Sequence, residues 1–347
     1  MKKGTTMNKF FKTIILLLTL TFSVATFTGC SGAVATTLNG AYFLKNKANT
    51  GIGNVNETVN YDVSFTQSAD TLESGIEIAV KKGTYTTTLT STVEPQSQTP
   101  CYKLETLLTI EIEYTLGETV QPVKEDVIST TTYFLGVKDR FKTLSSHRHT
   151  KTSAPIKTDD GFVIKEYEYT ITTTYANNSA SVEFNPIKGE FSQGKGTKTY
   201  DKLDKPAYYF DNEVMLMVGR AINFTDSSSL TFSTIDPLSA TVREMKVSSD
   251  ATTPTEKIQF KSEKIPHAYM VNGFTSGEIG EDGEQLNLNC RVVNFAINGT
   301  FTGTPIKCWY TDSNIANGYA RLIKMQTSAP YGLGTFTYIV TSATYND

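Results

Sequence analysis

Apolar and polar residues alternate with a period of two along most of the chain from Tyr61 onward, which is the pattern of β-strands with one buried face. Tyr61, Val63 and Phe65 share one face of the first such stretch. In residues 108–116 and 166–175, the Leu, Ile and Tyr residues fall on one face, and Glu with most of the threonines falls on the other. Strands of a parallel sheet would be apolar on both faces, so the alternation favours an antiparallel sheet with one face in water.

One segment departs from the alternation. Asp211-Asn212-Glu213 supplies capping and acidic first-turn residues, and residues 214–221 are apolar nearly all round. This pattern predicts a short buried helix over roughly 211–222, lying in the hollow of a curved sheet. The predicted fold class is therefore mainly β: a large curved antiparallel sheet, or unclosed barrel, with a short helix packed in the concave face.

The N-terminal residues have the pattern of a secretion signal. Four lysines without an acidic residue lead into an apolar run, residues 13–27, that is too short for a comfortable transmembrane helix. The segment from Phe27 to Cys30 then resembles a bacterial lipobox, in which the Cys30 thiol is acylated and the cysteine becomes the mature N-terminus. The alternative is an ordinary signal peptide cut near Ala25.

The lipobox interpretation divides the chain into three parts. Residues 1–29 form the signal peptide, 30–55 a lipidated N-terminus and tether, and 56–347 a single large β-domain in which 90–205 is a candidate extension. Two or more acyl chains give stable membrane attachment, whereas one chain binds only marginally. We therefore expect the protein on the extracytoplasmic face of the cell membrane, held there by its lipid.

Charge narrows the choice of partners. Loss of residues 1–29 removes four lysines and no acidic residue, which leaves 28 basic against 35 acidic side chains and a formal charge of −7. A mildly acidic body without a basic patch argues against nucleic acid and against electrostatic docking on anionic lipid. The hydrophobic content of 39% is that of a globular chain with a core.

Cys101, Cys290 and Cys308 follow the lipobox cysteine, and an odd number of cysteines leaves at least one unpaired. Asn298-Gly299 is a two-residue hairpin signal, which predicts strand partners whose residue numbers sum to 597. Cys290 would then face Ile306 or Lys307, the Cys290 and Cys308 thiols would point to opposite faces, and we expect reduced thiols. A three-residue loop or a bulge would instead bring the two thiols opposite each other.

No motif for nucleophilic catalysis, zinc proteolysis or phosphate cradling is present, so no enzymatic activity, metal or cofactor is predicted. His147 and His149 could share a strand face around a metal, but their basic surroundings favour an exposed loop or strand pair. The acidic cluster at 278–284 fits a hydrated turn better than a calcium loop. Cys101 has no obvious base, and His267 is expected to be structural.

The predicted helix and its surroundings are rich in Met and aromatic residues, as in adaptable pockets for apolar ligands. Arg220, if buried there, needs a carboxylate, a carbonyl or an anionic ligand group. The same composition also suits an ordinary core plug. The candidate ligand-binding residues are Tyr208, Phe210, Met215, Met217, Arg220 and Trp309.

Two stretches carry a family resemblance. Residues 210–220 pair an Asp-Asn-Glu segment with an apolar turn that ends in arginine, and Cys308-Trp309-Tyr310 precedes a polar turn and the strand residues 321–325. Glu57, Tyr61 and Phe65 fit the first strand. The body resembles bacterial envelope proteins of unknown function, several of them lipoproteins, with a fold similar to the Lol-type lipoprotein carriers. The resemblance implies a bent antiparallel sheet with helices in its concavity, and it implies no activity by itself.

Two functional hypotheses follow. The first is a non-enzymatic envelope protein that binds a hydrophobic or amphiphilic small molecule in the concave face, with Arg220 meeting a polar head. The alternative is a surface or scaffold protein that binds another protein through exposed strands and fills its hollow with its own side chains. An enzyme that acts on cell-wall glycans is a distant third.

Overall fold

The computed structural model describes fourteen segments of the chain: residues 52–73, 75–136, 141–159, 161–176, 179–191, 194–200, 214–221, 229–236, 241–249, 256–261, 285–297, 306–311, 321–329 and 332–346. Several predictions lie outside these segments. They concern the signal peptide with Cys30, the candidate pocket residues Tyr208 and Phe210, His267, and the acidic cluster at 278–284.

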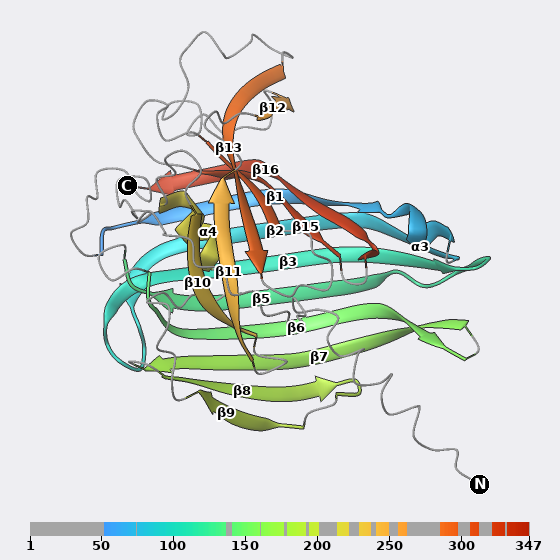
Figure 1. The fold of residues 1–347 in the computed structure, drawn as a ribbon, viewed down its shortest axis with the longest axis horizontal. Coiled ribbons are helices and arrows are strands. Elements are labelled where there is room, and N and C mark those ends of the chain that lie inside the picture. The colour runs from blue at the N-terminus through green and yellow to red at the C-terminus, as the bar shows by residue number, and fades with distance from the viewer. Residues whose placement is uncertain are drawn as a thin grey trace.

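Strands dominate the described residues (Figure 1). The elements in chain order are β1 (Asn56–Gln67), α3 (Ala69–Glu73), β2 (Ile76–Val93), β3 (Pro100–Leu116), β4 (Thr119–Val120), β5 (Lys124–Phe134), β6 (Thr143–Thr158), β7 (Gly161–Ala176), β8 (Ser179–Lys188), β9 (Gly196–Tyr200), α4 (Val214–Ala221), β10 (Ser229–Asp236), β11 (Thr241–Ser249), β12 (Glu256–Lys261), β13 (Gln285–Ile297), β14 (Ile306–Thr311), β15 (Leu322–Ser328) and β16 (Gly334–Asn346). No helix in the described segments is long and apolar enough to cross a membrane.

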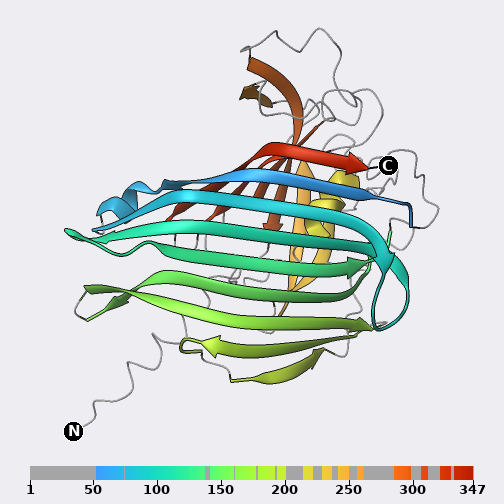
Figure 2. The same cartoon turned by 180° about the vertical axis from the view of Figure 1, so that it is seen from behind.

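All the strands belong to one antiparallel sheet that does not close. Its order is β10-β11-β13-β14-β15-β16-β1-β2-β3-β5-β6-β7-β8-β9, with β12 added beside β13 and β4 beside β3. From behind, β16 and β1–β9 form one broad layer, and α4 with the remaining strands lies on its far side (Figure 2). The predicted fold class is thus confirmed: a mainly β protein with a large, curved, unclosed antiparallel sheet.

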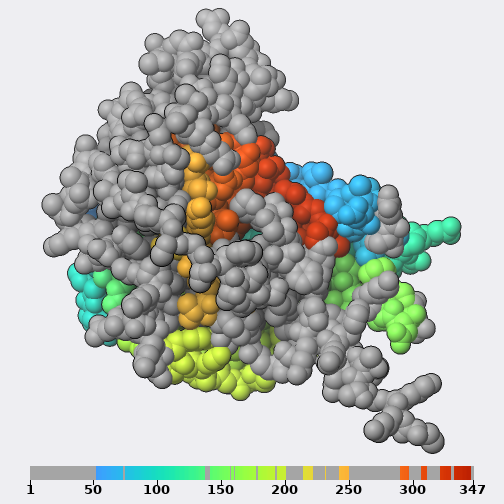
Figure 3. All heavy atoms as spheres, viewed as in Figure 1, coloured from blue at the N-terminus to red at the C-terminus, as the bar shows by residue number. Residues whose placement is uncertain are grey.

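The strands of residues 90–205 continue this sheet outward from its centre. β3 pairs with β2 along most of its length, and β5, β6, β7, β8 and β9 follow in chain order. The edge strand β9 pairs with β8 over five residues. In the space-filling view, the yellow-green atoms of this part of the sheet form the lower margin of the molecule (Figure 3).

The alternation predicted from the sequence is found in the strands. Tyr61 and Val63 of β1 are buried while their neighbours Asp62 and Ser64 are exposed. On β3 the buried side chains include Ile110, Ile112 and Tyr114, and on β7 they are mainly tyrosine and isoleucine. Each of these strands therefore has one face on the core, as an antiparallel sheet with a solvated outer face requires.

The register of the sheet shows which residues share the inner face. Directly opposed residues of neighbouring strands point to the same side of a sheet. One row of such partners runs from β1 to β8 through Glu57, Leu89, Leu104, Thr132, Ser146, Thr173 and Val182. Glu57 contacts α4, so this row and those parallel to it form the inner face of the curved sheet.

The inner face carries three apolar clusters and a polar zone. A large apolar cluster joins α4 to β1–β3, β11 and β13–β16, with Tyr61, Leu89 and Tyr310 among its members. A second apolar cluster lies on β7 and β8, where Tyr169 and Phe184 stack at 5.6 Å between ring centroids. A small third cluster joins Ala154 and Ile156 of β6 to Tyr167 of β7. Between the first two clusters, β5 and β6 carry the polar side chains Thr130, Thr132, Arg148 and Thr150. The polar zone is thus part of the interior surface.

Candidate functional site

Helix α4 is enclosed by the sheet. All eight residues of Val214–Ala221 are buried, as the apolar sequence predicts. Tyr310 on β14 donates its hydroxyl hydrogen bond to the carbonyl of Leu216 at 2.9 Å. A side chain at Gly219 would place its Cβ 2.7 Å from Tyr310 Cζ and 2.9 Å from Phe295 Cζ. Glycine therefore lets the helix backbone approach these two rings at a distance that no other residue allows.

Arg220 at the end of α4 forms a bidentate ion pair with Glu57 on β1. Its Nη1 lies 2.8 Å from Glu57 Oε1 and its Nη2 lies 3.0 Å from Oε2, and the two side chains are only 2% and 6% exposed. The planar fork of a guanidinium matches a carboxylate in this geometry. The sequence predicted that a buried Arg220 needs an acidic partner or an anionic ligand group, and the structure supplies the carboxylate from the protein itself.

The candidate pocket residues separate into two groups. Met215 and Met217 are buried on α4, and Met217 Sδ lies 3.6 Å from Arg220 Nη1. Trp309 lies on the opposite face of β14 from Tyr310, since strand side chains alternate. There the ammonium groups of Lys307 and Lys324 sit 4.7 and 4.4 Å from its ring centroid. Trp309 is nevertheless only 1% exposed, and it belongs to the same apolar cluster as Met215 and Met217.

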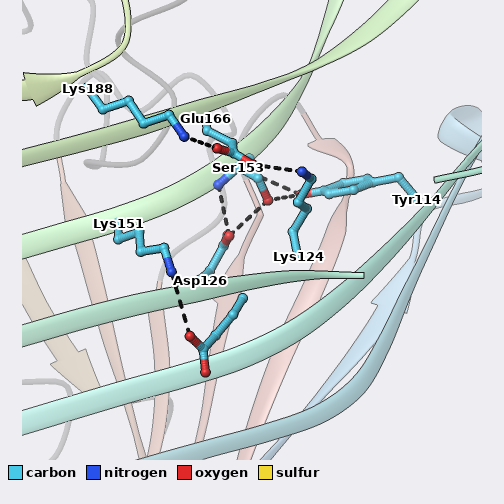
Figure 4. Close-up of polar contacts among 8 residues, drawn as sticks. Tyr114, Lys124, Asp126, Lys151, Ser153, Glu166 and Lys188 are labelled. Atoms are coloured by element: carbon cyan, nitrogen blue, oxygen red, sulfur yellow. Dashed lines mark hydrogen bonds and ion pairs between the residues drawn. The ribbon is translucent and has the colours of Figure 1, made fainter. Parts of the chain in front are cut away.

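A second polar cluster marks the place where β6 separates from β5. The β5–β6 ladder ends at the pair Val127↔Lys151. Beyond it, the Asp126 carboxylate accepts hydrogen bonds from the Ser153 amide and hydroxyl and from Thr152 Oγ1, each at 2.8 Å (Figure 4). Tyr114 donates to the Ser153 carbonyl at 3.1 Å. The β5–β6 ladder no longer provides an acceptor for the Ser153 backbone amide, and the Asp126 carboxylate takes that role.

The two carboxylates near this split have opposite electrostatic environments. Burial raises the pKa of Asp126 to about 6, although its three hydrogen bonds and nearby Lys151 act to lower it. Hydrogen bonds from Lys124 and Lys188 lower the pKa of the more exposed Glu166 to about 2. Glu166 lies between these two lysines, which come from β5 and β8 (Figure 4). Its carboxylate links strands on the two sides of the split.

The predicted histidine pair lies on strand β6. His147 is exposed, with Nδ1 3.0 Å from Thr172 Oγ1, and the Nε2 atom of His149 is 2.9 Å from Glu168 Oε1. Both point outward because they alternate with inward Arg148. Within the described segments, no group of three or more His, Cys, Asp or Glu residues is arranged to hold a metal ion.

The three cysteines of the described segments are buried, and none of them forms a disulfide within those segments. Burial raises the pKa of the Cys101 thiol to about 11, which is the opposite of the lowering that activates a nucleophilic cysteine. The predicted hairpin register is wrong. Cys308 pairs with Val293 and Cys290 with Thr311, so partner numbers sum to 601 and not to 597. The shift is even, and the two thiols still point to opposite faces.

The sequence analysis missed a polar strip on the inner face, which we call the hydroxyl strip: Thr87, Thr106, Thr130, Thr132 and Thr150 with Arg148. The threonines are at most 5% exposed. Thr106 and Thr130 share a hydrogen bond at 2.6 Å, and Arg148 Nε donates to Thr150 Oγ1 at 3.2 Å. The period-two pattern could have revealed the strip, because outward His147 and His149 require inward Arg148.

No protein-family model, curated protein or solved structure matches the chain. The resemblance to envelope lipoproteins and to Lol-type carriers therefore stays a prediction.

The Arg220–Glu57 pair yields a stability prediction. Arg220→Met leaves Glu57 buried without its partner, and we expect a loss of about 3–5 kcal/mol in the free energy of unfolding. The double variant Arg220→Met/Glu57→Gln removes both charges and should lose less than the sum of the single changes. Urea denaturation measures all three. The exposed pair Lys165–Glu190 is the matched control, for which the same cycle should give less than about 1 kcal/mol. Strictly additive losses at Arg220 and Glu57 would contradict the predicted coupling.

Asp126 yields a pH prediction. Its folded-state pKa of about 6 exceeds the ordinary value of 3.8, so the folded protein takes up a proton at a higher pH than the unfolded chain does. The contribution of Asp126 to stability therefore grows as the pH falls from about 6 to about 4, by about 1–3 kcal/mol. Asp126→Asn keeps the hydrogen-bonding shape and lacks the titration. The unfolding free energies of the two proteins, measured by urea denaturation across this range, should differ in slope. Parallel pH profiles would show that Asp126 titrates normally.

Proposed function

We propose that this chain is a lipid-anchored, extracytoplasmic, non-enzymatic protein that binds a hydrophobic or amphiphilic molecule on the inner face of its curved sheet. One observation carries the proposal: the inner face combines a large apolar cluster with the adjacent hydroxyl strip. Buried polar groups cost free energy unless they are satisfied, and in this strip the Arg148 Nη atoms and Thr132 Oγ1 have no partner among the described residues. An amphiphile offers both kinds of contact.

The location of the ligand differs from the first expectation. The sequence pointed to α4 and its methionines, with Arg220 as the group that meets a polar head. Because Glu57 neutralises Arg220 and Tyr310 bonds and packs against the α4 backbone, α4 belongs to the self-filled part of the interior. We therefore assign the ligand to the region over β5–β7, which includes the β5 and β6 members of the hydroxyl strip, Thr130, Thr132, Arg148 and Thr150.

The membrane location rests on the N-terminal sequence. Residues 1–30 combine a basic start, a short apolar run and a lipobox-like end at Cys30. Residues 31–51 then separate Cys30 from the sheet, since Gly53 and Val55 already donate hydrogen bonds to Tyr102 and Ser91. That segment is long enough to hold the sheet away from the lipid surface while the acyl chains keep the protein on the membrane.

A scaffold protein is the second candidate, and the packing of α4 favours it. An interior filled by the protein's own side chains needs no ligand, and an unclosed sheet has edges that can pair with another chain. In strand order the edges are β9 and β10, and β9 pairs only with β8 among the described strands. The two candidates differ in whether a small molecule copurifies.

Replacement of the acylated cysteine tests the anchor. The full-length chain with Cys30→Ala cannot carry the thioether-linked lipid, so we expect it to leave the membrane fraction. Fractionation and immunoblotting compare it with the unchanged chain and with Cys101→Ala, a control at a buried cysteine. Membrane retention of Cys30→Ala that withstands alkaline extraction would overturn the lipobox interpretation.

Native mass spectrometry tests the ligand. We expect the Cys30→Ala chain to carry an added mass of a few hundred daltons, the size of a typical pocket ligand, that is released on denaturation. Met217→Trp should overpack the buried helix region yet keep this mass, because the proposed ligand lies over β5–β7. Loss of the added mass in Met217→Trp would show that the ligand binds beside α4 and not over β5–β7. A bare polypeptide mass, with no uptake of a dodecyl-chain amphiphile, would favour the scaffold.

A further inference from the structure

Arg148 is the positive charge of the hydroxyl strip. It is held on β6 between Ser146 and Thr150, whose side chains are on the same face. It is the β6 member of the inner row Val59, Thr87, Thr106, Thr130, Arg148, Ile171 and Phe184. A row of three buried threonines thus ends at a guanidinium inside the curve of the sheet.

No carboxylate of the described residues forms an ion pair with Arg148. Its Nε donates to Thr150 Oγ1, which leaves both Nη atoms without a described acceptor. The inner carboxylate of Asp126 lies four residues from Thr130 along β5, or about 13 Å away, and its oxygens already accept three hydrogen bonds. Glu168 lies on the outer face, where it contacts His149. Arg148 therefore differs from Arg220, which has a carboxylate of its own.

Thr132 provides an independent observation. It is fully buried, and its Oγ1 has no hydrogen-bond partner. Thr132 is the diagonal neighbour of Arg148, because Thr130 stands directly opposite Arg148 and Thr132 is the next inward residue of β5. A buried hydroxyl without a partner destabilises the folded state, so its presence beside a guanidinium with free Nη atoms indicates a group that both would bind.

We propose that Arg148, Thr130, Thr132 and Thr150 bind an oxyanion, namely the phosphate or carboxylate head of an amphiphile that lies on the inner face. The inference rests on the proposed function and adds the head-group chemistry to it. A guanidinium binds such an oxyanion through two parallel N–H···O bonds, and hydroxyl groups donate to the remaining oxygens. The apolar clusters on either side of the strip would receive the chain of the amphiphile.

Titration calorimetry with two matched detergents below their critical micelle concentrations tests this assignment. Dodecyl phosphate and dodecyl maltoside have the same chain, and only the phosphate head carries charge. We expect the full-length chain with Cys30→Ala to bind dodecyl phosphate at least tenfold more tightly. Arg148→Gln should lower the affinity for dodecyl phosphate by about that factor and leave dodecyl maltoside binding unchanged.

Two further variants separate recognition from folding. Thr132→Val is nearly isosteric and removes an unpartnered hydroxyl, so it should leave the unfolding midpoint unchanged or raise it, and should weaken dodecyl phosphate binding several-fold. Lys151→Gln removes a positive charge from the outer face of the same strand and should leave both affinities unchanged. Thr132→Val remains informative even if Arg148→Gln fails to fold.

The outcomes distinguish the head-group site from the proposed function. Equal affinity for the two detergents, unaffected by Arg148→Gln and Thr132→Val, would overturn the oxyanion site while amphiphile binding stands. Binding of inorganic phosphate that depends on Arg148, without binding of either detergent, would support an oxyanion site for a free anion and overturn the amphiphile. Absence of binding for all three probes would overturn both proposals.

Discussion

The ion pair between Arg220 and Glu57 is the contact that makes the helix and the sheet one structure. It joins side chains 163 positions apart, and it commits α4 to the inner face of β1. A guanidinium enclosed in apolar surroundings is stable only with a matched carboxylate, and Glu57 is equally dependent on Arg220. Around this pair, the Gly219 backbone approaches Tyr310 and Phe295, and the large apolar cluster closes over all of α4. The zone that surrounds α4 is therefore already occupied by the protein itself.

The rest of the interior contains two polar regions, one whose hydrogen bonds are all made and one in which some are not. In the Asp126 cluster the carboxylate accepts hydrogen bonds from the Ser153 amide and hydroxyl, at the point where β6 separates from β5. By contrast, the two Nη atoms of Arg148 and the Oγ1 atom of Thr132 have no hydrogen-bond partner among the described groups. This contrast between two polar regions of one sheet identifies β5 and β6 as the place for a ligand. The overall fold alone does not.

The features that the sequence predicted well are those that depend on local pattern. Period-two alternation identified the buried face of β1, β3 and β7, and the apolar run after Glu213 identified α4. Features set by distant contacts could not be predicted in the same way. The Asn298-Gly299 signal predicted strand partners whose numbers sum to 597, whereas the observed partners sum to 601. No local pattern indicates that Arg220 pairs with Glu57. The inward position of Arg148 is fixed by its outward-pointing neighbours His147 and His149, whereas its lack of a carboxylate partner depends on distant strands.

The pairing of the first and last strands has a consequence for how the protein is made. β1 lies between β2 and β16, and its twelve residues all have partners on the final strand. A chain that emerges from its N-terminus cannot complete the centre of the sheet until its last residues have arrived, since these contacts span nearly the whole domain. Until then one side of β1 is an open edge that can pair with another molecule. Synthesis would thus have to reach the end of β16 before the core can form, and loss of the residues of β16 would remove the partner of the first strand.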